Sequence, residues 1–209
     1  NTQEIDEWRA AGNGILQSNV QPGDVRFVDR NHDGQINNKD KVNLGNGTPD
    51  FTLGLNLGFV YKGFDFSIVA NGAFGQQIVQ SYRNHTRPTP NYTTAILDRW
   101  HGEGTSNRIP RVTDSNINYQ FSALFIQNGD YLRLSTLTLG YDFAKLFKGK
   151  AVSQARLYFQ VQNLFTITGY DGMDPEIGFG SSNNSWVSGL DYVYYPRPRT
   201  VLVGVNLKF

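Results

Sequence analysis

The strongest constraint on the fold of this chain is an alternation of apolar and polar residues that persists over long runs. The runs cover residues 51–61, 64–74, 131–143, 155–165 and 199–209. In FTLGLNLGFVY, the first run, the apolar odd positions alternate with Thr52, Gly54, Asn56 and Gly58. Because successive side chains of a strand point to opposite faces, each run predicts a β-strand with one apolar and one polar face.

The length of these runs separates them from the strands of an ordinary soluble sheet, which usually have about five or six residues. About ten residues, at roughly 3.3 Å per residue and a tilt of some 40°, span the ~25 Å apolar band of an outer-membrane barrel. Aromatic residues such as Phe59, Tyr61, Phe64 and Phe74 lie near the ends of the runs, as in interfacial girdles. The sequence therefore predicts an all-β, transmembrane antiparallel barrel.

The connections between the runs alternate in length. Lys62-Gly63 forms a two-residue hairpin turn, residues 144–154 form a shorter link, and residues 75–129 and 166–198 form long loops. Outer-membrane barrels have short periplasmic turns and long external loops. This rule predicts an extracellular segment at residues 1–50 and a periplasmic C-terminus. A change of phase near Ser135 and Thr136 predicts a β-bulge.

The predicted strands are too few to close a barrel, since the smallest membrane barrels have about eight strands. An unpaired strand edge is not tolerated in lipid. We therefore expect the chain to be the C-terminal part of a larger barrel, with residues 51–209 in the barrel and residues 1–50 outside it.

The segment DRNHDGQINNKD, residues 29–40, predicts a metal site. Calcium loops of the EF-hand type supply ligands from positions 1, 3, 5, 7, 9 and 12, with glycine at position 6. Hard oxygen ligands favour calcium over transition metals, whereas an Asx-rich turn is the alternative interpretation. No EF-hand helices are expected beside the segment, so we expect a structural calcium site. The candidate ligands are Asp29, Asn31, Asp33, Gln35 through its carbonyl, Asn37 and Asp40, with Gly34 at the turn.

Composition argues against other functions. The net charge of +1 and the absence of a basic cluster give no reason to expect nucleic-acid binding, and the absence of cysteine excludes a disulfide framework. Asp174 and Glu176 are compatible with a carboxylate pair of a glycoside hydrolase, but their spacing equally suits a turn. We expect no enzymatic activity. Aromatic residues in the long loops can stack on sugar rings, contact a partner or anchor the loops: Trp100, Trp186, Tyr192, Tyr194 and Tyr195.

Several segments together resemble the C-terminal region of SusC/RagA-type TonB-dependent outer-membrane transporters. They occur in the order of that family between Gly23 and Phe209. They are GDVRFVDRNHDGQINNKDKVNLGNGTPDFTLGLNLGFVYKGFDFSI, LDRWHGEGTSNRIPR, NGDYLRLSTLTLGY, VQNLFTITGYDGMDPE and YPRPRTVLVGVNLKF.

This resemblance implies a plugged barrel of about 22 strands, to which the chain would contribute the last five. It implies import of oligosaccharides or peptides together with a SusD-like surface lipoprotein. It also implies coupling to the TonB complex through the plug and N-terminal part, which have no counterpart here. Phe209 matches the terminal aromatic residue that serves as a barrel-assembly signal. The rival prediction is a secreted β-sandwich carbohydrate-binding module with a dockerin-like calcium loop.

Overall fold

The computed structural model describes residues 1–10, 17–83, 94–146, 152–177, 188–192 and 194–209. The chain divides into two compact units. Unit 1 comprises residues 1–44 and 83–124, and unit 2 comprises residues 45–82 and 125–209. The segment 83–124, which the sequence-based division at residue 50 assigned to the barrel part, thus clusters with the N-terminal segment.

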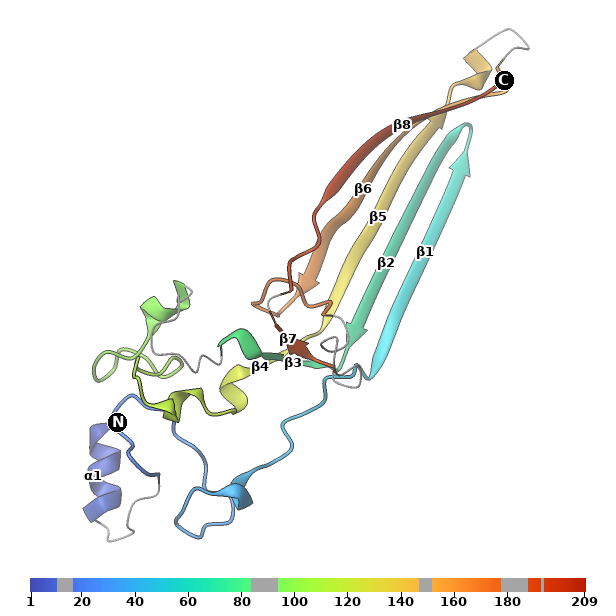
Figure 1. Ribbon diagram of the computed structural model, residues 1–209. Coiled ribbons are helices and arrows are strands. Elements are labelled where there is room, and N and C mark those ends of the chain that lie inside the picture. The colour runs from blue at the N-terminus through green and yellow to red at the C-terminus, as the bar shows by residue number, and fades with distance from the viewer. Residues whose placement is uncertain (11–16, 84–93, 147–151, 178–187, 193) are drawn as a thin grey trace. The chain divides into compact units, whose positions relative to one another are not determined.

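Unit 2 contains one antiparallel sheet of five long strands (Figure 1). Its order is β1-β2-β5-β6-β8, so neighbours in the sheet follow one another along the chain. The five predicted strands are confirmed with nearly the predicted bounds. They are β1 (Phe51–Tyr61), β2 (Phe64–Phe74), β5 (Tyr131–Asp142), β6 (Gln154–Thr168) and β8 (Thr200–Lys208).

The register of the sheet collects the apolar residues on one face. One cross-strand row of that face consists of Leu57, Ile68, Leu137, Val161 and Val201. Many side chains of this face remain exposed, among them Leu57 (52%) and Val203 (71%). Within the described residues, no second layer covers this apolar face. Such exposure is unfavourable in water and appropriate for a surface that faces lipid.

The predicted β-bulge is confirmed, and β6 contains a matching irregularity. In the pairing with β2, Val69 lies opposite Thr136 and Ala70 opposite Leu134, so Ser135 is the extra residue of β5. The pairing of β5 with β6 also shifts between Leu134 and Thr136. Opposite the shift, Asn163 adopts the left-handed conformation with φ 51°, and its side-chain amide donates to the Pro198 carbonyl at 3.0 Å. The two neighbouring bulges therefore bend adjacent strands at one level.

A second, smaller sheet in the order β4-β3-β7 lies within the predicted long loops. It consists of β3 (Gln77–Gln80), β4 (Ile126–Asn128) and β7 (Leu190–Asp191). In Figure 1 it lies at the ends of the long strands, away from the Lys62-Gly63 turn. Strands β3 and β7 pair in parallel. A Cβ on Gly189 would lie 2.6 Å from the Gly47 Cα atom, so glycine permits this close approach of two backbones.

The helix α1 (Thr2–Ala10) lies in unit 1, and the other helices of the described residues, in both units, are short 3-10 turns. These turns are η1 (Asn38–Asp40), η2 (Ser81–Arg83), η3 (Thr94–Asp98), η4 (Asn116–Tyr119), η5 (Ala123–Phe125) and η6 (Ala144–Leu146). Among the described residues, no helix is long and apolar enough to cross a membrane.

A buried carboxylate joins the two segments of unit 1. The Asp24 side chain is inaccessible to solvent and accepts hydrogen bonds from the Arg111 guanidinium at 2.7 Å and from the Asn118 amide at 3.0 Å. Nearby, Trp100 lies so close to Gly23 that a Cβ there would lie 2.3 Å from the indole ring. Trp100 therefore packs against the chain itself, as in the loop-anchoring interpretation given above.

Candidate functional site

The predicted calcium loop, residues 29–40, forms a turn held by its own acidic side chains. The Asp29 carboxylate accepts a hydrogen bond from the Gly34 N–H at 2.9 Å, and Asp33 accepts one from the Gln35 N–H at 3.0 Å. Asp40 accepts from the Arg30 N–H at 2.9 Å and from the Asn37 N–H at 2.7 Å. Gly34 has φ 77°, a left-handed conformation suited to glycine at the sixth loop position.

These hydrogen bonds favour the charged form of the carboxylates. The Asn31 side-chain amide holds the pKa of Asp33 below its ordinary value, with smaller contributions from the Gln35 N–H and the Asn37 amide. The backbone N–H groups of Asn37 and Arg30 lower the pKa of Asp40. Both groups are therefore ionised at neutral pH, as carboxyl ligands of a cation must be.

The donor set fits calcium in its chemistry. The Asp29 Oδ1 atom is buried and has no hydrogen-bond partner, so it offers lone pairs to a cation. The remaining carboxylate oxygens are occupied by N–H groups of the loop, as in Asx turns. In the described part of the chain, no three His, Cys, Asp or Glu side chains gather as in a formed metal centre. Calcium binding by residues 29–40 stays a prediction.

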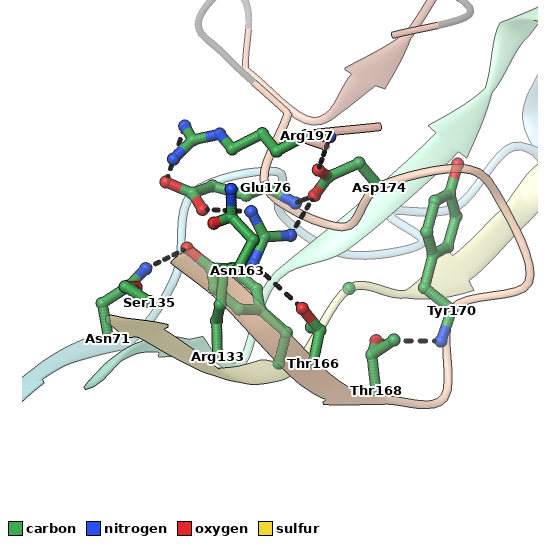
Figure 2. Close-up of polar contacts among 12 residues, drawn as sticks. Asn71, Arg133, Ser135, Asn163, Thr166, Thr168, Tyr170, Asp174, Glu176 and Arg197 are labelled. Carbon is green, nitrogen blue, oxygen red and sulfur yellow. Dashed lines mark hydrogen bonds and ion pairs between the residues drawn. The ribbon is translucent and has the colours of Figure 1, made fainter. Parts of the chain in front are cut away.

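A second polar cluster lies where the second long loop leaves and rejoins the long sheet of unit 2 (Figure 2). Arg133, on the polar face of β5, is only 3% exposed. Its guanidinium donates to Asp174 at 2.6 Å, to Glu176 at 3.0 Å and to the Thr166 hydroxyl at 2.9 Å. Arg197 extends the cluster through an ion pair with Glu176 at 2.9 Å. We call Arg133, Asp174, Glu176 and Arg197 the arginine cluster.

The small sheet is anchored to the same loop by buried hydrogen bonds. The Asp191 side chain has no exposed surface and accepts a hydrogen bond from the Tyr170 hydroxyl at 2.5 Å. Gln80, also fully buried, donates to Asp171. Burial, followed by the hydrogen bond to Asp191, raises the pKa of Tyr170, so its hydroxyl remains a donor. Tyr170 and Asp191 thus join the two ends of the second long loop.

The arginine cluster positions this loop and does not resemble a catalytic centre. Asp174 and Glu176 are both paired with the same arginine, so the turn interpretation of these two residues is the better one. Arg133 was not among the predicted site residues, although a cation on the polar face of the run YLRLS is a signal in the sequence. The cluster fixes the start of the loop, at Asp174, and its end, at Arg197, against the sheet.

The other predicted residues differ in their exposure to solvent. Tyr195 is 86% exposed and Tyr192 is 55% exposed, whereas Tyr194 is half-buried. Phe209 follows β8 and is 84% exposed. Trp186 lies outside the described residues.

The chain was compared with known proteins. No protein-family model matches it. It is 34% identical to TonB-dependent receptor P3 of Formosa agariphila over 95% of the chain and 20% of that receptor. It is 30% identical to TonB-dependent receptor SusC of Bacteroides thetaiotaomicron over 93% of the chain and 18% of that receptor. The chain thus spans about one fifth of the length of these curated relatives.

Solved structures show the same fold. The RagAB peptide transporter superposes with a TM-score of 0.63 at 24% identity, covering 79% of this chain and 18% of that chain. The RagAB peptide importer in its open-open state gives a TM-score of 0.60 at 25% identity, covering 78% and 17%. The predicted resemblance and the all-β barrel fold are therefore confirmed. These relatives are receptors and transporters, in agreement with the prediction that the chain is not an enzyme.

Proposed function

We propose that this chain, as a relative of the TonB-dependent receptors, forms part of the barrel wall and external loops of an outer-membrane receptor for nutrient import. The receptor would take up oligosaccharides or peptides together with a SusD-like surface lipoprotein. The remainder of the barrel, with its plug, would supply the missing strands and the contact with the TonB complex. The names of the relatives support this role, since they include SusC and a peptide transporter.

The observation that carries the proposal is the long sheet with its uncovered apolar face. Strands β1 and β8 are its two edges, and within the described residues neither has a second neighbouring strand. A secreted sandwich would cover this face with another sheet. A larger barrel in lipid instead pairs both edges and leaves the apolar face to the membrane. We further propose that the Lys62-Gly63 turn and Phe209 face the periplasm, and that Phe209 serves as the assembly signal.

The proposed assembly predicts a stable complex in the outer membrane. When the receptor that contains this chain is affinity-purified in mild detergent from outer-membrane vesicles, we expect a surface lipoprotein to co-purify in about a one-to-one ratio. Mass spectrometry of the complex measures this ratio. Recovery of the chain from the soluble fraction would contradict the barrel, whereas an outer-membrane receptor without a lipoprotein would contradict only the partner.

We also propose that calcium orders residues 29–40 in an external loop of this receptor. Asp29, Asn31, Asp33, Asn37 and Asp40 would contribute side-chain oxygens, and Gln35 its backbone carbonyl. The bound cation would neutralise the clustered carboxylates and hold the turn at Gly34 closed. The buried, unpartnered oxygen of Asp29 supports this assignment. An ordered loop would present a fixed surface to the lipoprotein.

The calcium proposal predicts a local effect of ligand removal. For the Asp29→Ala, Asp33→Ala double variant, we expect cleavage within residues 29–40 to be at least about tenfold faster in limited proteolysis, because the opened loop is more populated. A chelator should produce the same change in the natural receptor and none in the variant. The matched control is Asp6→Ala with Asp114→Ala, which removes the same charge from exposed positions elsewhere in unit 1. Cleavage insensitive to the chelator would contradict calcium binding.

A further inference from the structure

A pocket of about 100 Å³ lies within unit 1, between α1 and the segment of residues 17–26. The helix contributes Ile5 and Trp8, which lie one turn apart and therefore on the same helix face. The segment contributes Val20 and Pro22. All four side chains are half-buried. The walls of this pocket are therefore apolar and aromatic.

The wall formed by the segment is held in place by hydrogen bonds. The Gln17 side chain donates to the Val25 carbonyl at 2.8 Å and accepts from the Phe27 N–H at 3.2 Å. The Asp24 carboxylate accepts from the Gln21 N–H at 2.8 Å, which closes a tight turn. These bonds order the wall before any ligand arrives, as in other pre-formed ligand pockets.

Charged groups line the same pocket and remain accessible. The Arg26 guanidinium pairs with the Glu4 carboxylate and so joins the two walls, while their side chains stay 73% and 45% exposed. Arg9, which is also exposed, adds further donors. Both carboxylates of the lining, Glu4 and Asp24, are paired with arginines, the second with Arg111. The lining therefore offers donors and acceptors but does not favour a cationic ligand.

The Trp8 indole has a hydrogen-bonding group that the chain leaves unsatisfied. Within the described residues, its Nε1 atom is buried and has no hydrogen-bond partner. A buried donor without an acceptor is unfavourable, so an oxygen atom supplied by a ligand would stabilise it. The faces of the same ring offer apolar surface. The pocket therefore suits a ligand that combines an apolar face with oxygen atoms at its edge.

We propose that this pocket binds a saccharide ring. A pyranose ring carries C–H groups on its faces, which would pack on Trp8 and Ile5. Its hydroxyl groups both donate and accept, so they would donate to Glu4 and accept from Arg26. An aliphatic side chain of a peptide would fill the walls but leave these polar groups unused. The inference goes beyond the proposed import, because a site within unit 1 would bind sugar whether or not the barrel transports it.

The test is protection of a thiol in the full receptor, purified in a detergent whose head group carries no sugar and with its other cysteines replaced. Ile5→Cys and Val20→Cys each place a thiol in the pocket, and Asp6→Cys, on the exposed face of α1, is the matched control. The probes are glucose, galactose, mannose, xylose and glucuronate.

We expect at least one of these sugars to protect both pocket thiols from a small maleimide. At a concentration of about ten times its Kd, the sugar should slow labelling about tenfold, because only the free pocket reacts. Labelling of Asp6→Cys should not change. The absence of protection by every sugar would overturn the proposal, as would protection by an apolar dipeptide alone.

Two substitutions test the chemistry of recognition. Arg26→Gln, at a side chain that is 73% exposed, leaves the walls intact and should weaken sugar binding at least about fivefold through loss of a charged donor. Trp8→Phe keeps an aromatic face, removes the N–H and should also weaken binding. Unchanged affinity in both variants would overturn the assignment to this pocket. Recovery of the receptor in the outer membrane is measured separately, so failure of sugar binding and failure of the proposed function are distinguishable.

Discussion

Replacing Arg133 with methionine is expected to detach the second long loop from the barrel wall. The guanidinium is almost fully buried and satisfies Asp174, itself 4% exposed, together with Glu176. Methionine keeps the apolar volume but leaves the buried Asp174 carboxylate without its cation, whereas Glu176 keeps its ion pair with Arg197. Breaking a buried pair by removal of one partner costs about 3–5 kcal/mol. Denaturant unfolding of the receptor in lipid vesicles, with proteolysis of residues 169–199, measures this loss.

Two other substitutions define the specificity of this effect. Arg199→Met removes an exposed arginine near the same loop end and should change the free energy of unfolding by no more than about 0.5 kcal/mol. Combining Arg133→Met with Asp174→Asn removes the unpaired charge and should restore part of the loss. A stability of Arg133→Met equal to that of Arg199→Met would show that the buried ion pairs do not hold the loop.

The long strands were predictable because their signal is local. Each run of alternating residues specifies two faces, and a slip by one residue would move every apolar side chain to the polar face. The same logic located the bulge at Ser135, since a change of phase requires an extra residue. The Lys62-Gly63 turn fixed the pairing of β1 with β2, because a two-residue hairpin leaves one register.

The contacts within the long loops were not predictable from local patterns. Strand β7 is two residues long and pairs with β3 across more than a hundred intervening residues. Asp174 and Glu176 form an unremarkable acidic turn in the sequence, and only the fold shows that Arg133 lies between them. The clustering of residues 83–124 with residues 1–44 likewise depends on Asp24 and Arg111, which lie 87 positions apart. Residues that pair over such separations show no periodic pattern in the sequence.

The candidate calcium loop could be located from the sequence, but its occupancy by calcium could not be predicted. Its motif is matched except that Asp40 replaces the usual glutamate at the twelfth position, and the glycine conformation at position 34 agrees with it. The same Asp and Asn side chains, however, satisfy the backbone of an Asx-rich turn. Residue identity therefore predicts which atoms can bind a cation, whereas occupancy depends on the free energy gained when calcium replaces the N–H groups of the loop. The chelator experiment tests whether a bound cation holds this loop.

Leu137→Arg is expected to be strongly destabilising, because Leu137 lies in the middle strand of the apolar row that runs from Leu57 to Val201. If this face contacts lipid, an arginine near the bilayer midplane costs about 2–4 kcal/mol. The adjacent Thr138→Arg places the same side chain on the polar face of the same strand and should cost within about 0.5 kcal/mol. Urea unfolding of the receptor folded into lipid vesicles compares the two variants.

The sign of the difference in unfolding free energy between these two variants shows which face of the sheet contacts lipid. A larger loss for Leu137→Arg places the Leu57-to-Val201 row in lipid, and the polar face, with Arg133, inside the barrel. A larger loss for Thr138→Arg would reverse that assignment and move the arginine cluster to the outside. Positions 137 and 138 both lie in strand β5, so a general preference of this segment for strand or helix does not explain the contrast. The contrast instead reports the surroundings of the two faces of the sheet.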